Sequence, residues 1–208
     1  MPFSDPLADG PVIQESSQKA IQNGMTIKLL FEQLADLRKH TQIPVVLMGY
    51  LNPVLQYGLE AFLSKCTEVG VDGIILPDLP LEIYVQDWKV QFEKEGVSNI
   101  LLITPQSSED RIKAIDDAST GFVYVVSSNS ITGANKKFDR QAEYYKSIKE
   151  RNLKNPTLIG FGIHDSKTFE EACQYSNGVI IGTAFIKHIT AEGIGEKSIH
   201  EFVKNIRL

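Results

Sequence analysis

Two glycine motifs near the C-terminal end of the chain have the residue types of a phosphate site. Gly160-Phe161-Gly162 and Gly182-Thr183-Ala184 each follow a short apolar run, so each lies where a strand would end. Glycine lets the backbone approach a ligand more closely than a residue with a Cβ, and backbone N–H groups at a helix N-terminus bind anions. Either motif alone would also suit an ordinary tight turn. Because they follow consecutive strands, we expect them to bind phosphate together.

Two further polar segments are candidates for a site. Residues 127–135 are long, polar and glycine-bearing, which suits either a mobile lid or a plain exposed loop. Tyr124 lies two residues before the end of the preceding apolar run, and its side chain can point to either face of a sheet. Residues 2–14 contain three prolines and are expected to form an irregular loop. Asp5 and Asp9 would be solvated turn carboxylates there, or functional groups, since apolar residues surround them.

Several kinds of chemistry are disfavoured by the motifs that the sequence lacks. The chain has neither the glycine-rich nucleotide motif that ends in Lys-Ser/Thr nor a Gly-x-Ser-x-Gly nucleophile motif. Its four histidines are scattered, without the spacing of metal ligands, so no metal site is expected. Lysine does not stand alone at an apolar strand end, which disfavours a Schiff-base aldolase.

The elements that position these motifs alternate along the chain. Six short apolar runs, typical of strands covered on both faces, are found at residues 44–48, 73–76, 100–103, 121–126, 157–160 and 178–181. Stretches with helical spacing include residues 27–37, 59–69, 138–151 and 196–207, and Ser107 and Asp165 are expected as N-caps. This alternation predicts one α/β domain with a parallel sheet. A small or polar loop follows every strand, which favours a (β/α)8 barrel over an open doubly wound sheet, although a barrel needs eight strands.

Composition sets limits on partners and location. The 208 residues carry 26 acidic and 21 basic side chains, a formal charge of -5, which argues against nucleic acid or an anionic membrane surface as the main partner. No apolar run approaches the roughly 18 residues that a membrane span requires. The two cysteines, Cys66 and Cys173, are too few for a disulfide scaffold. We therefore expect a cytoplasmic protein.

These motifs together resemble one family, the tryptophan synthase alpha subunit. The glycine motifs, residues 127–133 and the segment Pro2-Phe3-Ser4-Asp5-Pro6-Leu7-Ala8-Asp9-Gly10-Pro11 carry the resemblance. Tyr50-Leu51-Asn52-Pro53 and Pro77-Asp78-Leu79-Pro80 match it too, so the likeness runs from Pro2 to the final predicted helix. The family is a (β/α)8 barrel that cleaves indole-3-glycerol phosphate to indole and glyceraldehyde 3-phosphate by a retro-aldol step, without metal or organic cofactor.

The resemblance implies roles for individual residues. Asp9 would be catalytic, bonding the indole N–H and stabilising the positive charge that develops on the protonated ring. Tyr124 would approach the substrate near Asp9, and Thr132 would bond Asp9 when the lid closes. The remaining implied substrate contacts are Phe161 on the indole ring, Ile13 and Tyr50 along the pocket, and Gly133, Gly160, Gly162, Gly182 and Thr183 at the phosphate. Pro2 and Asp5 would touch a partner beta subunit in an alpha2beta2 complex, and that partner alone carries pyridoxal phosphate.

The sequence departs from the family in one respect. The family's general acid–base glutamate lies on the second strand, upstream of the Pro-Phe-Ser-Asp-Pro segment, so residues 1–208 contain neither it nor the first strand, helix and second strand. Neither Glu15 nor Asp78 is an evident substitute. We therefore expect a barrel domain over residues 1–208 that lacks two strands, exposes sheet edges and is inactive or weakly active by itself.

Two alternative functions remain open. In the first, the chain is a catalytically inactive barrel that binds a phosphorylated ligand and regulates a beta subunit. In the second, it is another phosphate-binding barrel, such as an isomerase. The isomerase alternative ranks lower, because those barrels share the glycine turns but not the N-terminal motif.

Overall fold

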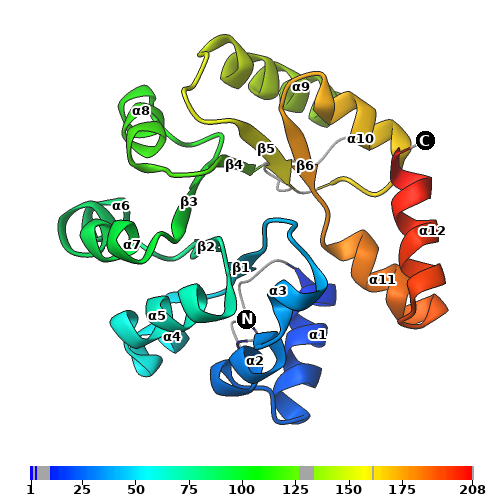
Figure 1. Ribbon diagram of the computed structural model, residues 1–208. Helices are drawn as coiled ribbons and strands as arrows, with labels where there is room; N and C mark the ends of the chain where they lie inside the picture. Colours follow the sequence, from blue (N-terminus) through cyan, green and yellow to red (C-terminus); the bar gives the residue numbers. More distant parts are fainter. Residues whose placement is uncertain (2, 4–9, 127–133, 161, 208) are drawn as a thin grey trace. The chain divides into compact units, whose positions relative to one another are not determined.

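The structure of the protein, a computed structural model, describes residues 1, 3, 10–126, 134–160 and 162–207, without the side chains of residues 134–140. The chain divides into two compact units. Unit 1 comprises residues 1–101 and 118–121, and unit 2 comprises residues 102–117 and 122–208. In both units, helices alternate with short parallel strands (Figure 1).

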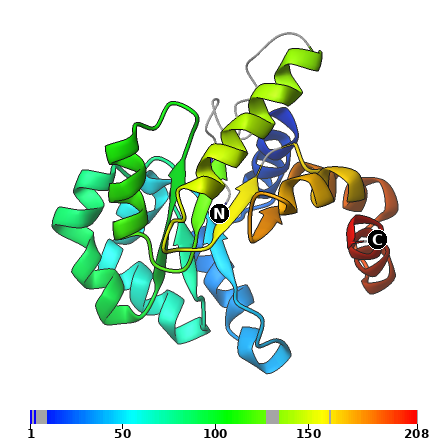
Figure 2. The same ribbon diagram turned by 90° about the horizontal axis from the view of Figure 1, so that it is seen from above.

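Unit 1 is built around three parallel strands in chain order. Its elements are α1 (Pro11–Gln22), α2 (Ile27–Leu34), α3 (Leu37–His40), β1 (Val46–Met48), α4 (Leu51–Tyr57), α5 (Leu59–Val69), β2 (Gly73–Ile75), α6 (Leu81–Ile83), the π-helical turn η1 (Tyr84–Trp88), α7 (Lys89–Glu95) and β3 (Ser98–Ile103), whose last two residues belong to unit 2. Val46 pairs with Gly73, which in turn pairs with Ser98. Helices α5 and α7 contact each other and cover one face of these strands (Figures 1 and 2).

The core of unit 1 follows from the helical spacing of its apolar residues. Phe62, Leu63 and Cys66 are fully buried on α5, and Ile74 of β2 is buried with them. Phe62 also contacts the rings of Phe31 and Tyr57. Burying side chains of this size removes them from water, which contributes roughly 1.5–3 kcal/mol each.

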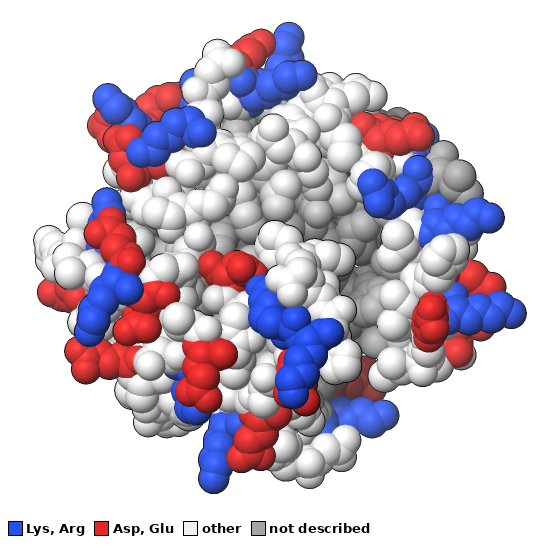
Figure 3. Space-filling model, viewed as in Figure 1, with Lys and Arg blue, Asp and Glu red and all other residues white. Residues whose placement is uncertain are grey.

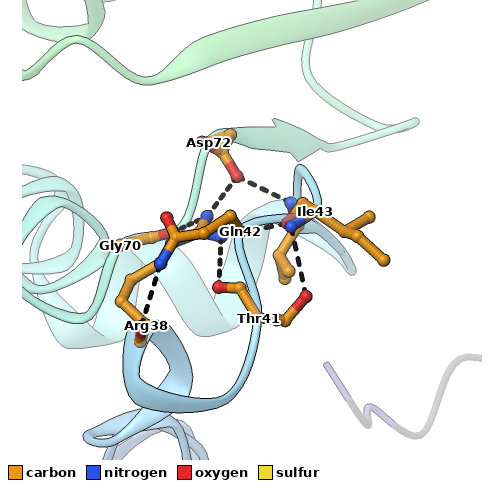
Figure 4. A network of polar contacts seen from close by, with 7 residues as sticks. Arg38, Thr41, Gln42, Ile43, Gly70 and Asp72 are labelled. Carbon is orange, nitrogen blue, oxygen red and sulfur yellow. Dashed lines mark hydrogen bonds and ion pairs between the residues drawn. The ribbon is translucent and has the colours of Figure 1, made fainter.

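Arg38 joins three segments at the end of unit 1 where its strands begin (Figure 4). Its guanidinium donates to the carbonyl oxygens of Ile43, at 3.0 Å, and of Gly70, and forms an ion pair with Asp72. Asp72 Oδ2 also accepts from the backbone N–H of Val45 at 2.6 Å. Gly70 ends α5 with φ of 82°, as expected for a left-handed helix stop. These contacts, which we call the Arg38 brace, fix the starts of β1 and β2 to the ends of the helices before them.

Unit 2 repeats the same arrangement. Its elements are α8 (Glu109–Ala118), β4 (Val123–Val126), α9 (Ala134–Glu150), β5 (Thr157–Gly160), α10 (Ser166–Cys173), β6 (Gly178–Ile180), α11 (Thr183–Glu192) and α12 (Glu196–Arg207). Strand β5 is parallel to both β4 and β6. Buried residues of unit 2 include Val123, Val125 and Ile159 on the strands and Ile148 on α9. At the opposite end from the glycine motifs, the buried Asp116 carboxylate accepts from the backbone N–H groups of Lys154, at 2.9 Å, and Asn155, at 3.1 Å.

The structure confirms the six predicted strands and the predicted alternation with helices. In the described residues, β1 pairs with no strand but β2 and β6 with no strand but β5, so the other edge of each has no partner strand. On β1 the Met1 amine donates to the Met48 carbonyl oxygen at that edge. No helix in the described part of the chain is long and apolar enough to cross a membrane.

Three boundaries differ from expectation. The irregular loop expected over residues 2–14 is wrong at its end, because Pro11 begins α1. Proline suits the first position of a helix, where the N–H has no partner within the helix. The helical stretch expected over residues 27–37 is interrupted after Leu34 and resumes at Leu37. The N-cap before α8 is Ser108, whose hydroxyl accepts from Arg111 N–H at 3.3 Å, whereas the Ser107 hydroxyl accepts from Thr104 N–H.

The face of the molecule drawn in Figure 3 carries acidic and basic side chains interspersed over the helices. Several oppositely charged side chains of the described residues form i,i+4 or i,i+3 pairs on one helix, such as Lys65 with Glu68 and Lys197 with Glu201. Exposed pairs of this kind contribute little to stability, because solvent screens the two charges.

Candidate functional site

Tyr124 and Gly160 form the best defined part of the candidate site, and both lie in unit 2. Tyr124 pairs with Leu158 across β4 and β5, and Val126 pairs with Gly160. Residues two apart on a strand share a face, so Tyr124 lies diagonally across from Gly160 on the same face. A Cβ at Gly160 would overlap the ring and the hydroxyl oxygen of Tyr124. Only glycine therefore fits at position 160, because the Tyr124 side chain, only 4% exposed, occupies the space that a Cβ would need.

The pairing of β5 with β6 brings the two glycine motifs side by side. Gly160 is the register partner of Ile180, so Gly162 and Gly182 each stand two residues beyond a paired position. Gly162 has φ of 82° and no heavy atom within 4 Å of the position of a Cβ. That backbone conformation is open to glycine and strained for most other residues. The predicted neighbourhood of the two motifs is thus found in unit 2.

The second motif opens a helix, as its sequence predicted. Gly182 is the N-cap of α11, and Thr183 is the first residue of this ten-residue helix. Both residues are exposed. The N–H groups of a first helical turn have no partners within the helix and carry a partial positive charge. An anion at this turn would be stabilised without any basic side chain.

The loop after Gly162 is held by a capping box at the start of α10. Asp165 Oδ1 accepts from Thr168 N–H at 2.8 Å, and Thr168 Oγ1 accepts from Asp165 N–H at 3.1 Å. The Thr168 N–H and the Thr168 hydroxyl both donate to this carboxylate, and these two bonds lower the pKa of the Asp165 carboxyl. His164, which follows the motif, is exposed, and its Nδ1 lies 2.8 Å from the Gly162 carbonyl oxygen. The loop that contains Gly162 is therefore held between the end of β5 and the capping box of α10.

Tyr50 and Ile13 belong to unit 1. Tyr50 follows β1 as the N-cap of α4, and its ring lies 5.5 Å from that of Phe3. Asp78, at the end of β2, holds the same loop, because both of its carboxylate oxygens accept from Leu51 N–H at 2.9 and 3.0 Å. Ile13 is half-buried in the first turn of α1. Sequence reasoning did not find the contact of Asp78, although its place two residues after an apolar run was a usable signal.

The other predicted site residues lie outside the described part of the chain. They are Pro2, Asp5, Asp9, Thr132, Gly133 and Phe161. The roles implied for these residues, including the catalytic role of Asp9, therefore stay predictions.

The titratable side chains described in the structure do not suggest a nucleophile or a metal centre. Burial raises the pKa of the Cys66 thiol to about 12 and also raises that of Cys173, so neither thiol ionises readily at neutral pH. Burial likewise raises the pKa of Tyr84 to about 12. Among the described residues, no group of three His, Cys, Asp or Glu side chains is placed to hold a metal ion. The chemistry that these residues offer is binding of an anion beside a buried tyrosine.

Comparison with known proteins places the chain in a family. The model of the family described as tryptophan synthase alpha chain matches residues 1–207. The tryptophan synthase alpha chain of Flavobacterium psychrophilum is 57% identical over 207 residues, which cover 99% of this chain and 81% of the relative. That of Flavobacterium johnsoniae is 53% identical over 208 residues, which cover all of this chain and 81% of the relative.

Solved structures agree with the sequence comparison. A chain of the tryptophan synthase a2b2 complex from Pyrococcus furiosus is 34% identical, with a TM-score of 0.84 over 99% of this chain and 82% of that chain. The tryptophan synthase alpha chain from Legionella pneumophila is 31% identical, with the same TM-score over all of this chain and 77% of that chain. The predicted fold class, a (β/α)8 barrel represented by six strands, is confirmed. Because the family model spans residues 1–207 and relatives are more than half identical, the chain belongs to the tryptophan synthase alpha chain family.

Proposed function

We propose that the protein acts in tryptophan biosynthesis as a lyase that cleaves indole-3-glycerol phosphate to indole and glyceraldehyde 3-phosphate. The observation that carries this function is the family match over residues 1–207. The paired glycine motifs at the ends of β5 and β6 support it, since the substrate is a phosphate ester and the N-terminus of α11 suits an anion. The partner is the beta subunit, which receives the indole in an alpha2beta2 complex and holds pyridoxal phosphate.

The site residues follow from the family resemblance and are proposed as a set. Asp9 bonds the indole N–H and stabilises the ring when C3 is protonated. The family's general acid–base glutamate supplies the proton to C3. The bond from C3 to the glycerol carbon then breaks, its electron pair restores the indole ring, and the neighbouring hydroxyl gives its proton back to that glutamate as the aldehyde forms. Phe161, Ile13 and Tyr50 pack around the indole.

Tyr124 lies beside the reacting atoms in this proposal, and the burial of its ring against Gly160 supports a fixed position. The phosphate is bound by Gly133, Gly160, Gly162, Gly182 and Thr183. Thr132 bonds Asp9 on closure and excludes water from the reacting ring. Pro2 and Asp5 contact the beta subunit.

Residues 1–208 by themselves are proposed to form one domain and to cleave the substrate weakly. In the family, the general acid–base glutamate precedes the segment that begins at Pro2. A group of this kind contributes about 10²–10⁴-fold to the rate. The Asp78 carboxylate is no ready substitute, because both of its oxygens bind Leu51 N–H. A cytoplasmic location is proposed as well, since both substrate and product of such a pathway are small metabolites.

The test is a comparison of two proteins in one assay. The 208-residue chain and a chimera, which adds the upstream segment of the F. psychrophilum relative, are each given indole-3-glycerol phosphate. Release of glyceraldehyde 3-phosphate is followed through a coupled dehydrogenase, and addition of the beta subunit with serine then reports tryptophan. Cleavage by the chimera at least about 100-fold faster than by the 208-residue chain supports the proposal. A chimera that binds substrate but does not cleave it would instead favour a regulatory barrel.

A further inference from the structure

Unit 2 contains a pocket between α9 and α10 that no step of the proposed reaction uses. Its volume is about 80 Å³. Helix α9 contributes one wall, and α10 with Tyr175, two residues beyond its end, contributes the other. The side chains that shape the pocket are Gln141, Ala142, Tyr145, Glu171, Ala172 and Tyr175. Among the described residues, the pocket shares only Gly162 with those predicted to bind the substrate.

The pocket is lined by aromatic side chains and by small ones. The ring centroids of Tyr145 and Tyr175 lie 6.4 Å apart, with an interplanar angle of 39°. Gln141 Nε2 donates to the Tyr145 hydroxyl at 3.0 Å, which restricts the orientation of that ring. Ala142 and Ala172 leave the space between the helices open, where larger side chains would fill it. A flat ring of similar size would contact the tyrosines at the distances that aromatic pairs prefer.

The charged residue in the pocket determines whether a cationic or an anionic ligand would bind. Among the residues that the structure describes, Glu171 is the only charged one that lines the pocket. Within the described part of the chain, the carboxylate of Glu171 forms no ion pair. The hydroxyl of Thr168, which also lines the pocket, is bonded to Asp165 in the capping box. A cation would therefore be attracted by this carboxylate, beside two tyrosine side chains, whereas an anion would be repelled.

We propose that this pocket binds a small aromatic amine. The ring packs beside Tyr145 and Tyr175 in the space that Ala142 and Ala172 leave open, and the protonated amine forms an ion pair with Glu171. The site is separate in chemistry from the glycine motifs, which suit an anion, and it does not depend on the lyase reaction. A ligand here would contact Gly162 and Ile163, so its binding is coupled to the loop that follows β5.

The proposal is tested with three probes that share one ring and differ in charge. Benzylamine, benzyl alcohol and benzoate are titrated into the 208-residue protein, and binding is followed by calorimetry and by NMR signals of the tyrosines. Benzylamine is expected to bind with a millimolar dissociation constant, and at least about threefold more tightly than benzyl alcohol. Benzoate is expected to bind the least. Equal binding of benzylamine and benzoate, or no binding of benzylamine, overturns the proposal.

Two variants and a matched control locate the binding. Glu171→Gln is expected to weaken benzylamine about three- to tenfold and to leave benzyl alcohol unchanged, because it removes only the charge. Ala142→Leu is expected to abolish binding of both by filling the pocket. Glu170→Gln changes the neighbouring carboxylate on α10, which does not line the pocket, and should bind as the unmodified protein does. Unaltered circular dichroism shows that each variant folds, and benzylamine binding that survives both Glu171→Gln and Ala142→Leu at full strength refutes the site.

Discussion

Gly160→Ala offers a direct test of how the candidate site is built. The added Cβ would overlap three atoms of the Tyr124 side chain, so either the ring or the end of β5 must move. Both lie in the buried part of unit 2, where forced overpacking costs roughly 1–3 kcal/mol. For a protein of this length, a loss of about 2 kcal/mol lowers the midpoint of thermal unfolding by roughly 4–8 °C.

A strand glycine in the same unit provides the control. A Cβ at Gly178 would meet a single atom, a terminal methyl of Leu158 at 2.9 Å, which can rotate away. Gly178→Ala should therefore cost less than about 1 kcal/mol, measured by the same thermal and urea unfolding followed by circular dichroism. Both glycines lie on parallel strands, so differences in backbone entropy largely cancel.

A double-mutant cycle separates the collision with the ring from other effects. In the Tyr124→Leu background the ring is absent, and Gly160→Ala should then be tolerated better by at least about 1 kcal/mol. The same change should weaken binding of indole-3-glycerol phosphate in the otherwise unmodified protein, because Tyr124 loses its position. If Gly160→Ala costs the same with and without the ring, or costs nothing, the steric account of this glycine is refuted.

Three other predictions follow from the remaining contacts. Gly70→Ala should destabilise the protein more than Gly96→Ala, since both glycines are left-handed helix stops but only at Gly70 does a Cβ meet Arg38 atoms, at 2.6 Å; equal unfolding midpoints would contradict this. Because the pKa of Asp165 is lowered in the folded protein, its carboxylate contributes fully to stability at pH values above 3.8, the ordinary pKa of an aspartate. This contribution is lost as the pH falls through the lowered pKa. Asp165→Ala should therefore flatten the acid limb of a stability–pH curve, and an unchanged limb would argue against the capping box. Cys66, with a pKa of about 12, should resist alkylation at pH 8 until urea unfolds the protein. Labelling of Cys66 itself in the native protein would contradict its burial.

The strands could be predicted from the sequence because each one is a short, uninterrupted apolar run. Thr157–Gly160 was predicted with its observed bounds, and the other five strands shifted by one or two residues at an end. The helix over residues 59–69 was predicted with its observed bounds, and the N-cap at Asp165 was predicted as well, since helical spacing and capping both depend on local chemistry.

Features set by contacts between distant residues could not be predicted in this way. The face chosen by Tyr124 depends on the absence of a side chain at Gly160, which lies 36 positions later on the neighbouring strand. The π-helical turn Tyr84–Trp88 has no sequence signature, and it buries two large aromatic side chains. The start of α1 at Pro11 was missed because proline is more often read as a helix breaker than as a first helical residue.

The Arg38 brace bears on how such a protein can change during evolution. It joins the ends at which β1 and β2 begin, whereas Tyr50 and Asp78 follow the opposite ends of the same strands. Stability in this unit is therefore secured away from the loops that would meet a substrate. A population of variants can sample new loop sequences after β1 and β2 while the brace continues to hold the strands in register. Selection for a new substrate and selection for folding would then act on separate sets of residues.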